Sequence, residues 1–183
     1  MLPVKELKLF AQRLTQQEFR EQLGPFVLVQ RPERDPSKGV GDTDQFGLPP
    51  NVQQTAMANP GAMATGALSL LFQFEDLVVA TVPPMQGVDE LAVGRSPDND
   101  LVLEHTSASK RHAVLRWDAA NARCSVQDLG STNGTFLNAS VRLRRETTLK
   151  NGDILSFGEV QYWFLLTDTL YVKLRGTDTF RRI

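Results

Sequence analysis

Cysteine and histidine are scarce in this chain of 183 residues, which has one cysteine and two histidines. A structural zinc site takes four nitrogen or sulfur ligands, so this supply predicts no metal centre. Cys124 has no second cysteine to pair with, which excludes a disulfide within the chain and fits a reducing compartment. No motif in the sequence predicts a bound cofactor.

Long apolar runs and a large net charge are also missing. No apolar run approaches the roughly 20 residues that cross a membrane as a helix. Residues 1–6 lack the basic-then-apolar layout of a secretory signal. The formal net charge of −1 argues against bulk binding of nucleic acid. With 41% hydrophobic residues the chain has enough apolar material for a core, and we expect a cytoplasmic protein.

The N-terminal segment, residues 1–30, is predicted to hold one amphipathic helix and a short apolar run. Apolar residues recur at three- and four-residue steps over residues 4–22, and Gly24-Pro25 ends the pattern. Two roles stay open for this helix: packing on its own domain or a second copy, which we favour, and docking to another protein. The run Phe26–Val29 is of strand type and is expected to pair or pack.

Residues 31–66 differ in composition from the segments on either side. Proline and glycine are frequent and large apolar residues are sparse. Such a segment buries too little surface to offset its ordering entropy. We predict a flexible linker.

Residues 67–167 carry the strand signals. Short β-type runs alternate with polar turns rich in Gly, Ser, Asn and Asp, which predicts a mostly β protein built as a β-sandwich. The expected strands cover residues 68–74, 77–82, 90–94, 100–103, 113–117, 123–126, 135–137, 141–143, 154–157 and 160–166. The tail, residues 168–183, is predicted to include a short helix at 168–175, which Gly176 ends.

Four polar motifs punctuate the strands: Gly94–Ser96, Ser109–His112, Ser131–Thr135 and Asn151–Asp153. Their hydroxyls, amides and cations suit the binding of an anion better than the breaking of a bond. The order and spacing of these motifs resemble a forkhead-associated (FHA) domain over residues 68–167. The resemblance implies a β-sandwich with its binding loops at one end and an affinity for phosphothreonine peptides.

The same resemblance implies a set of ligand residues. Arg95, Ser109 and Thr132 correspond to phosphate ligands, and Lys110 is expected to add charge because its ammonium lacks the bidentate fork of arginine. Asn133 corresponds to the residue whose amide binds the peptide backbone. A phosphothreonine brings roughly −1.5 to −2 charges and three acceptor oxygens, so these residue types fit it.

Other motif residues are expected to support the loops. Gly94 and Gly134 are assigned structural roles, and Asn151–Asp153 is predicted to form a hairpin turn without a ligand role. His112 is implied to be buried and to link the Arg95 loop to the Ser109 loop. The alternative role for His112 is that of a general base in a small hydrolase, but no nucleophile motif accompanies it. We therefore expect no enzyme.

The FHA resemblance implies a phosphothreonine-dependent binding module in Ser/Thr kinase signalling of the bacterial type. Its expected partner is a phosphothreonine-containing protein, such as a Ser/Thr kinase or its substrate. The alternative is an FHA fold that binds partners without phosphate. The run Arg142, Arg144 and Arg145 alternates with apolar residues and is assigned to the solvent face of a strand.

Thr43 is a candidate phosphorylation site in the predicted linker. The layout resembles that of some small bacterial FHA proteins, in which a phosphorylatable threonine precedes the domain and an apolar residue follows three places later. Phe46 fits that place, so the resemblance implies that a phosphorylated Thr43 could bind the pocket of its own chain. Thr55 fits this pattern less well because Ala58 stands at the matching place. The alternative, which the sequence favours, is that Thr43 is an ordinary residue of a polar linker.

Overall fold

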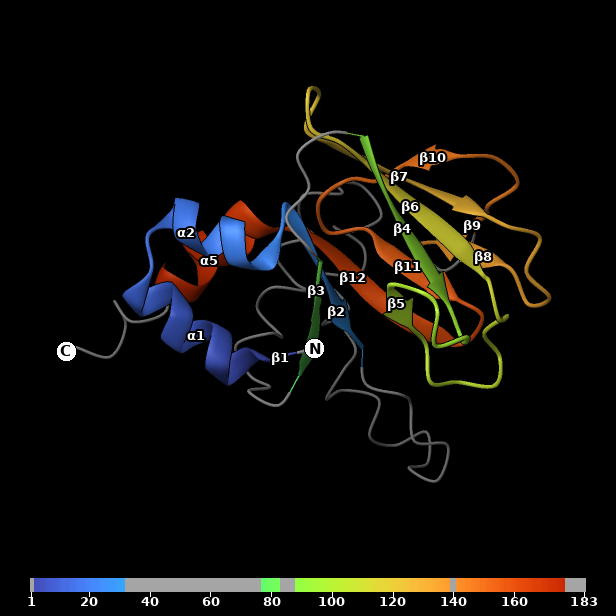
Figure 1. Cartoon of the computed structure of the whole chain (residues 1–183), viewed down its shortest axis with the longest axis horizontal. Coiled ribbons are helices and arrows are strands. Elements are labelled where there is room, and N and C mark those ends of the chain that lie inside the picture. Colours follow the sequence, from blue (N-terminus) through green and yellow to red (C-terminus); the bar gives the residue numbers. More distant parts are fainter. Residues whose placement is uncertain (1, 32–76, 83–87, 139–140, 177–183) are drawn as a thin grey trace, which may run out of the picture.

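The computed structural model describes residues 2–31, 77–82, 88–138 and 141–176. Most of the predicted linker, the expected strand at 68–74 and the candidate phosphorylation site Thr43 lie outside these residues. Twelve strands and three helices are found in the described part of the chain. The strands form two sheets packed face to face, as predicted for a β-sandwich (Figure 1).

The larger sheet has seven strands. Its order is β1 (Leu2–Pro3), β3 (Val78–Thr81), β2 (Phe26–Gln30), β12 (Val160–Leu166), β11 (Ile154–Phe157), β8 (Thr135–Leu137) and β9 (Val141–Arg142). The smaller sheet has the order β10 (Thr147–Thr148), β7 (Arg123–Asp128), β6 (Ala113–Asp118), β4 (Val88–Gly94) and β5 (Leu101–Val102). All pairs are antiparallel except β4 with β5.

The larger sheet is buried on both faces near its centre. In β2, Phe26 and Leu28 belong to the core between the sheets, whereas Val27 and Val29 belong to a second apolar cluster. Because neighbouring side chains of a strand point to opposite faces, the two clusters lie on the two sides of this sheet. β12 repeats the division, with its even-numbered apolar residues in the first cluster and Trp163 in the second. This double burial explains why both strands are continuous apolar runs.

Three helices cover the second apolar cluster: α1 (Val4–Arg13), α2 (Gln16–Leu23) and α5 (Thr167–Gly176). Figure 1 shows them together on the side of the larger sheet away from the smaller one. Both α1 and α2 contact α5. Of the two roles left open for the N-terminal segment, packing within its own chain is the one seen.

The prediction of one helix over residues 4–22 is wrong in its continuity. Leu14 and Thr15 have extended backbone conformations, and α2 begins anew after them. The Thr15 side chain accepts a hydrogen bond from the Glu18 amide, and the Glu18 carboxylate accepts one from the Thr15 amide. This capping box satisfies amides that would otherwise lack partners at the start of α2. A helix is present at the predicted place near the C-terminus, as α5.

The segment 1–30 does not stand apart from the rest of the sandwich. β2 pairs with β12 over Phe26–Gln30 and with β3 on its other side. Thr167 Oγ1 donates to the Gly24 carbonyl at 2.7 Å, which joins the end of β12 to the end of α2. The four-part division of the chain stays a prediction. The first part, residues 1–30, supplies β2 to the larger sheet. Most other strands of that sheet lie in the third part, residues 67–167.

Candidate functional site

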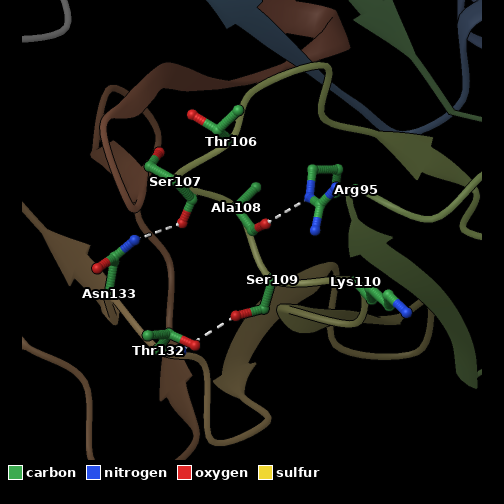
Figure 2. Close-up of a pocket in the computed structure, with 8 residues that line it drawn as sticks. All are labelled: Arg95, Thr106, Ser107, Ala108, Ser109, Lys110, Thr132 and Asn133. Carbon is green, nitrogen blue, oxygen red and sulfur yellow. Dashed lines mark hydrogen bonds between the residues drawn. The ribbon is translucent and has the colours of Figure 1, made fainter.

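Three loops meet at one end of the sandwich and enclose a surface pocket of about 320 Å³. They follow β4, β5 and β7. Eight residues line the pocket: Arg95, Thr106, Ser107, Ala108, Ser109, Lys110, Thr132 and Asn133 (Figure 2). All five residues assigned by the sequence to phosphothreonine are among them. None of the eight is acidic, so the lining offers two cations and several neutral donors to an anion.

Arg95 is held at the pocket by both its backbone and its side chain. Its amide donates to the Ser109 carbonyl at 2.9 Å, and its Nε donates to the Ala108 carbonyl at 3.2 Å. The rest of the guanidinium is exposed. Gly94 permits this approach, because a Cβ atom there would overlap the carbonyl oxygen of Lys110. The Arg95 and Ser109 loops are therefore joined through their backbones.

Asn99 strengthens the same junction, and the sequence analysis did not single it out. Its Nδ2 donates to the carbonyls of Ser96 and Lys110, each at 2.7 Å. The Ser96 amide adds a third bond, to the Lys110 carbonyl at 3.1 Å. The available signal was local: an asparagine three residues after a serine favours a side-chain-stabilised turn.

Ser109 and Thr132 bring the second and third loops together. The Thr132 amide donates to Ser109 Oγ at 3.0 Å. Because Ser109 Oγ accepts this bond, its own hydrogen is left to donate toward the pocket. The Lys110 side chain is exposed beside it.

Asn133 is anchored by one half of its amide. Its Nδ2 donates to the Ser107 carbonyl at 2.8 Å. Ser107, which sequence reasoning missed, is itself fixed by a bond from the Glu159 amide to its Oγ at 2.9 Å. A Cβ atom on Gly158 would lie 2.7 Å from this Oγ, so the approach of the two segments requires glycine there. These contacts set the position of the pocket wall formed by Ser107 and Asn133.

His112 is completely buried below the pocket. Its Nδ1 accepts from the Ser109 amide at 3.1 Å, so Nε2 carries the proton and donates to the Gly134 carbonyl at 3.2 Å. Burial lowers the pKa of the imidazole, against opposing effects of the Gly134 carbonyl and Asp128. The expected link between the Arg95 and Ser109 loops is thus replaced by one between the Ser109 and Gly134 loops. Neither ring nitrogen is open to a substrate.

Asp128 organises the loop that carries Thr132 and Asn133, and the sequence analysis did not identify it. Its carboxylate accepts from the Ser131 and Thr135 hydroxyls at 2.6 and 2.7 Å, and from the Gly130 and Ser131 amides at 3.0 Å. Burial acts to raise the pKa of this carboxyl, but these hydrogen bonds outweigh it and the pKa lies below its usual value. The negative charge of the Asp128 carboxylate is therefore held by hydrogen bonds within its own loop. The signal in the sequence was the Asp128-x-x-Ser131 spacing of an Asx-type turn.

Comparisons with known proteins agree with this architecture. The family model of the FHA domain matches residues 91–158. Two curated relatives are each 36% identical over 74 residues, or 40% of this chain: an oxoglutarate dehydrogenase inhibitor of Corynebacterium jeikeium and the glycogen accumulation regulator GarA of Mycobacterium tuberculosis. The crystal structure of the FhaA FHA domain is 30% identical, covers 46% of this chain and 87% of that one, and has a TM-score of 0.40.

The matches to the curated relatives are confined to part of each protein. They cover 49% of the Corynebacterium protein and 43% of GarA, so this chain spans about half the length of the relatives it matches. Residues 91–158, which the family model matches, include the three pocket loops, the buried His112 and parts of both sheets. Residues 91–158 of this chain are therefore identified as an FHA domain.

Proposed function

We propose that the pocket binds phosphothreonine in a partner protein and that the chain acts as a binding module in Ser/Thr kinase signalling. One observation carries the proposal: the loops after β4, β5 and β7 bring five residues to one pocket, namely Arg95, Ser109, Lys110, Thr132 and Asn133. Arg95 and Lys110 supply positive charge, and Ser109 and Thr132 supply hydroxyl donors. The side-chain oxygen of Asn133 takes no part in the bond to Ser107. It can therefore accept a hydrogen bond from a peptide amide.

The names of the relatives support the same proposal. One is an inhibitor of an enzyme and the other a regulator, which are roles carried out by binding. His112, the residue considered for a hydrolase, has both ring nitrogens engaged in the interior. Within the part of the chain that the structure describes, no helix is long and apolar enough to cross a membrane. We infer a cytoplasmic site of action, where protein kinases would provide the phosphothreonine.

Titration of matched peptides tests the proposal. The protein should bind a phosphothreonine peptide, selected from an oriented library, with micromolar affinity as the expected scale. It should not bind the unphosphorylated peptide. Hydrogen bonds to charged groups are worth about 1.5–3 kcal/mol each, so Arg95→Ala should weaken binding by roughly tenfold to more than a hundredfold. The fold should remain intact because the guanidinium is exposed.

Arg123→Ala is the matched control. Arg123 is also exposed, but it begins β7, at the end opposite Asp128 and the pocket loops. Binding to this variant should equal binding to the wild type. Equal affinity of the Arg95→Ala variant would remove Arg95 from the site. Equal affinity for the unphosphorylated peptide would favour a scaffold that works without phosphate.

A further inference from the structure

Three arginines border the pocket without forming part of it. Arg142 ends β9, and Arg144 and Arg145 follow two and three residues later. All three side chains are exposed. Over the described ranges, which omit residues 139–140, none of the three takes part in an ion pair. We call these residues the arginine patch.

The strand register places the patch beside the Thr132–Asn133 loop. Arg142 pairs with Phe136 of β8, and the Leu143 amide donates to the Thr135 carbonyl at 2.8 Å. A Cβ atom on Gly134 would lie 2.7 Å from Nε and 3.0 Å from Cζ of Arg142. The Arg142 guanidinium therefore lies against Gly134, the residue next to Asn133 in the pocket wall. Arg95 and Lys110 come from the other two loops.

Arg144 and Arg145 extend the patch toward the smaller sheet. The chain leaves β9 in the larger sheet and enters β10, where Thr147 pairs with Val126 of β7. β7 ends at Asp128 and leads into the Thr132–Asn133 loop. The connection between β9 and β10 thus runs along the same end of the sandwich as this loop.

Nearby acidic side chains do not neutralise the patch. The Glu146 carboxylate accepts from the Ser125 hydroxyl at 2.5 Å and lies 3.3 Å from Arg116 on the outer face of the smaller sheet. The Asp128 carboxylate is occupied by the loop it organises. Since the whole chain has a net charge of −1, an unpaired group of three arginines is a local feature rather than a consequence of overall composition.

We propose that the arginine patch is a second anion subsite, which selects phosphothreonine peptides carrying a further anionic side chain near the phosphothreonine. This rests on the proposed function, because the pocket holds the peptide against Asn133 and the patch begins at the neighbouring Gly134. The ligand chemistry is a carboxylate or a second phosphoryl group, both of which match the planar fork of arginine. A nucleic acid fits less well, since the run of three arginines contains no aromatic side chain for base stacking.

The test compares two phosphothreonine peptides that differ only in flanking residues, one with Glu and Asp and one with Gln and Asn at the same positions. An exposed ion pair is worth a factor of about 1.5 to 5 in affinity. With two such pairs, the acidic peptide should bind the wild-type protein about 2- to 25-fold more tightly, and less so as salt increases. A third peptide with one flanking phosphothreonine in place of the carboxylates separates the two sources of charge.

Arg142→Gln/Arg144→Gln/Arg145→Gln should reduce the preference for the acidic peptide to less than about twofold, while the neutral peptide keeps its affinity. Arg123→Gln, at the end of β7 far from the pocket loops, should change neither value. Tight binding of the neutral peptide with no preference for the acidic one would overturn the subsite and leave the proposed function standing. Loss of RNA binding in the triple variant, with peptide binding unchanged, would also overturn it. Failure of all three phosphopeptides to bind the wild-type protein would instead refute the proposed function.

Discussion

His112 acts on the pocket from below, through two backbone groups in different loops. Replacing it with alanine leaves the Ser109 amide without its acceptor and opens a cavity next to Phe157, whose ring contacts the imidazole edge-on. The Gly134 carbonyl keeps its bond from the Gly158 amide. We expect His112→Ala to lower the free energy of unfolding by roughly 1–3 kcal/mol and to weaken phosphopeptide binding. Thermal unfolding checks this, and an unchanged melting temperature with lost binding would point to direct contact with the ligand.

His112 also predicts a pH dependence. Burial first of all lowers the pKa of His112 below its ordinary value of 6.5, so the folded protein binds its proton less readily than the unfolded chain. The free energy of unfolding should therefore be fully maintained above pH 6.5 and should fall as the pH drops through and below that value. Urea unfolding across this range measures it. A His112→Asn variant should lack this part of the slope; the same slope in both proteins would contradict the assignment.

The motifs that carry the FHA resemblance predicted five of the eight residues that line the pocket, but not the contacts that hold the pocket wall in place. Arg95, Ser109 and Thr132 stand in recognisable local patterns. Ser107 and Gly158 meet only because distant segments of the fold approach each other, and no local pattern reports such an approach. Functional side chains were thus easier to predict than the backbone contacts that orient them. Their assignment to phosphothreonine stays a prediction until binding is measured.

At the scale of elements, the mostly β sandwich was predicted correctly. The break between α1 and α2 and the change of sheet between β10 and β11 were not predicted. The periodicity of residues 4–22 continues across Thr15, but the capping box gives the backbone there a stable alternative to the helix. The hairpin predicted at Asn151–Asp153 is wrong, because β10 before it and β11 after it belong to different sheets. Turn chemistry predicts a reversal of the chain, whereas strand pairing is set by the whole sandwich.

A substitution in the helical layer is expected to lower the free energy of unfolding without changing phosphopeptide affinity. Thr167 is fully buried between β12 and α5, and its hydroxyl donates to the Gly24 carbonyl. Thr167→Val keeps the shape but leaves that carbonyl unpaired, so we expect a loss of about 1–3 kcal/mol in the free energy of unfolding. Phosphopeptide affinity measured on the folded protein should not change. Thr169→Val is the matched control, because Thr169 lies two residues further along α5 and is only half-buried. A weaker affinity in Thr167→Val would mean that the helical layer influences the pocket.

At the scale of the whole molecule, the end of β2 and the start of β3 lie side by side toward the pocket end of the sandwich. β2 ends at Gln30, and the Arg31 amide donates to the Gln161 carbonyl at 2.8 Å. Gln161 stands two residues after Glu159, whose amide bonds to Ser107 in the pocket wall. β3, where the chain returns, pairs with β2 through Val79 and Val29. Arg31 and Leu77, the described residues on either side of 32–76, therefore both lie toward the pocket end of the sandwich.

The position of Arg31 toward the pocket end supports the proposal that phosphorylated Thr43 binds the pocket of its own chain. Only 12 residues separate Thr43 from Arg31, and fully extended they reach at most about 40 Å. A tether of this length gives an effective concentration on the order of millimolar, which exceeds a micromolar dissociation constant. Protein phosphorylated stoichiometrically at Thr43 should therefore bind external phosphopeptide at least about tenfold more weakly than unphosphorylated protein.

Two controls define this experiment. Protein phosphorylated at Thr55 should retain more of its affinity for external peptide. The residue three places after Thr55 is the small Ala58, whereas the residue three places after Thr43 is the large apolar Phe46. Sedimentation at increasing dilution should find the Thr43-phosphorylated protein monomeric, since binding between copies weakens on dilution and binding within one chain does not. Full affinity for external peptide after complete phosphorylation of Thr43 would rule out self-occupancy, and Thr43 would then be an ordinary residue of the segment.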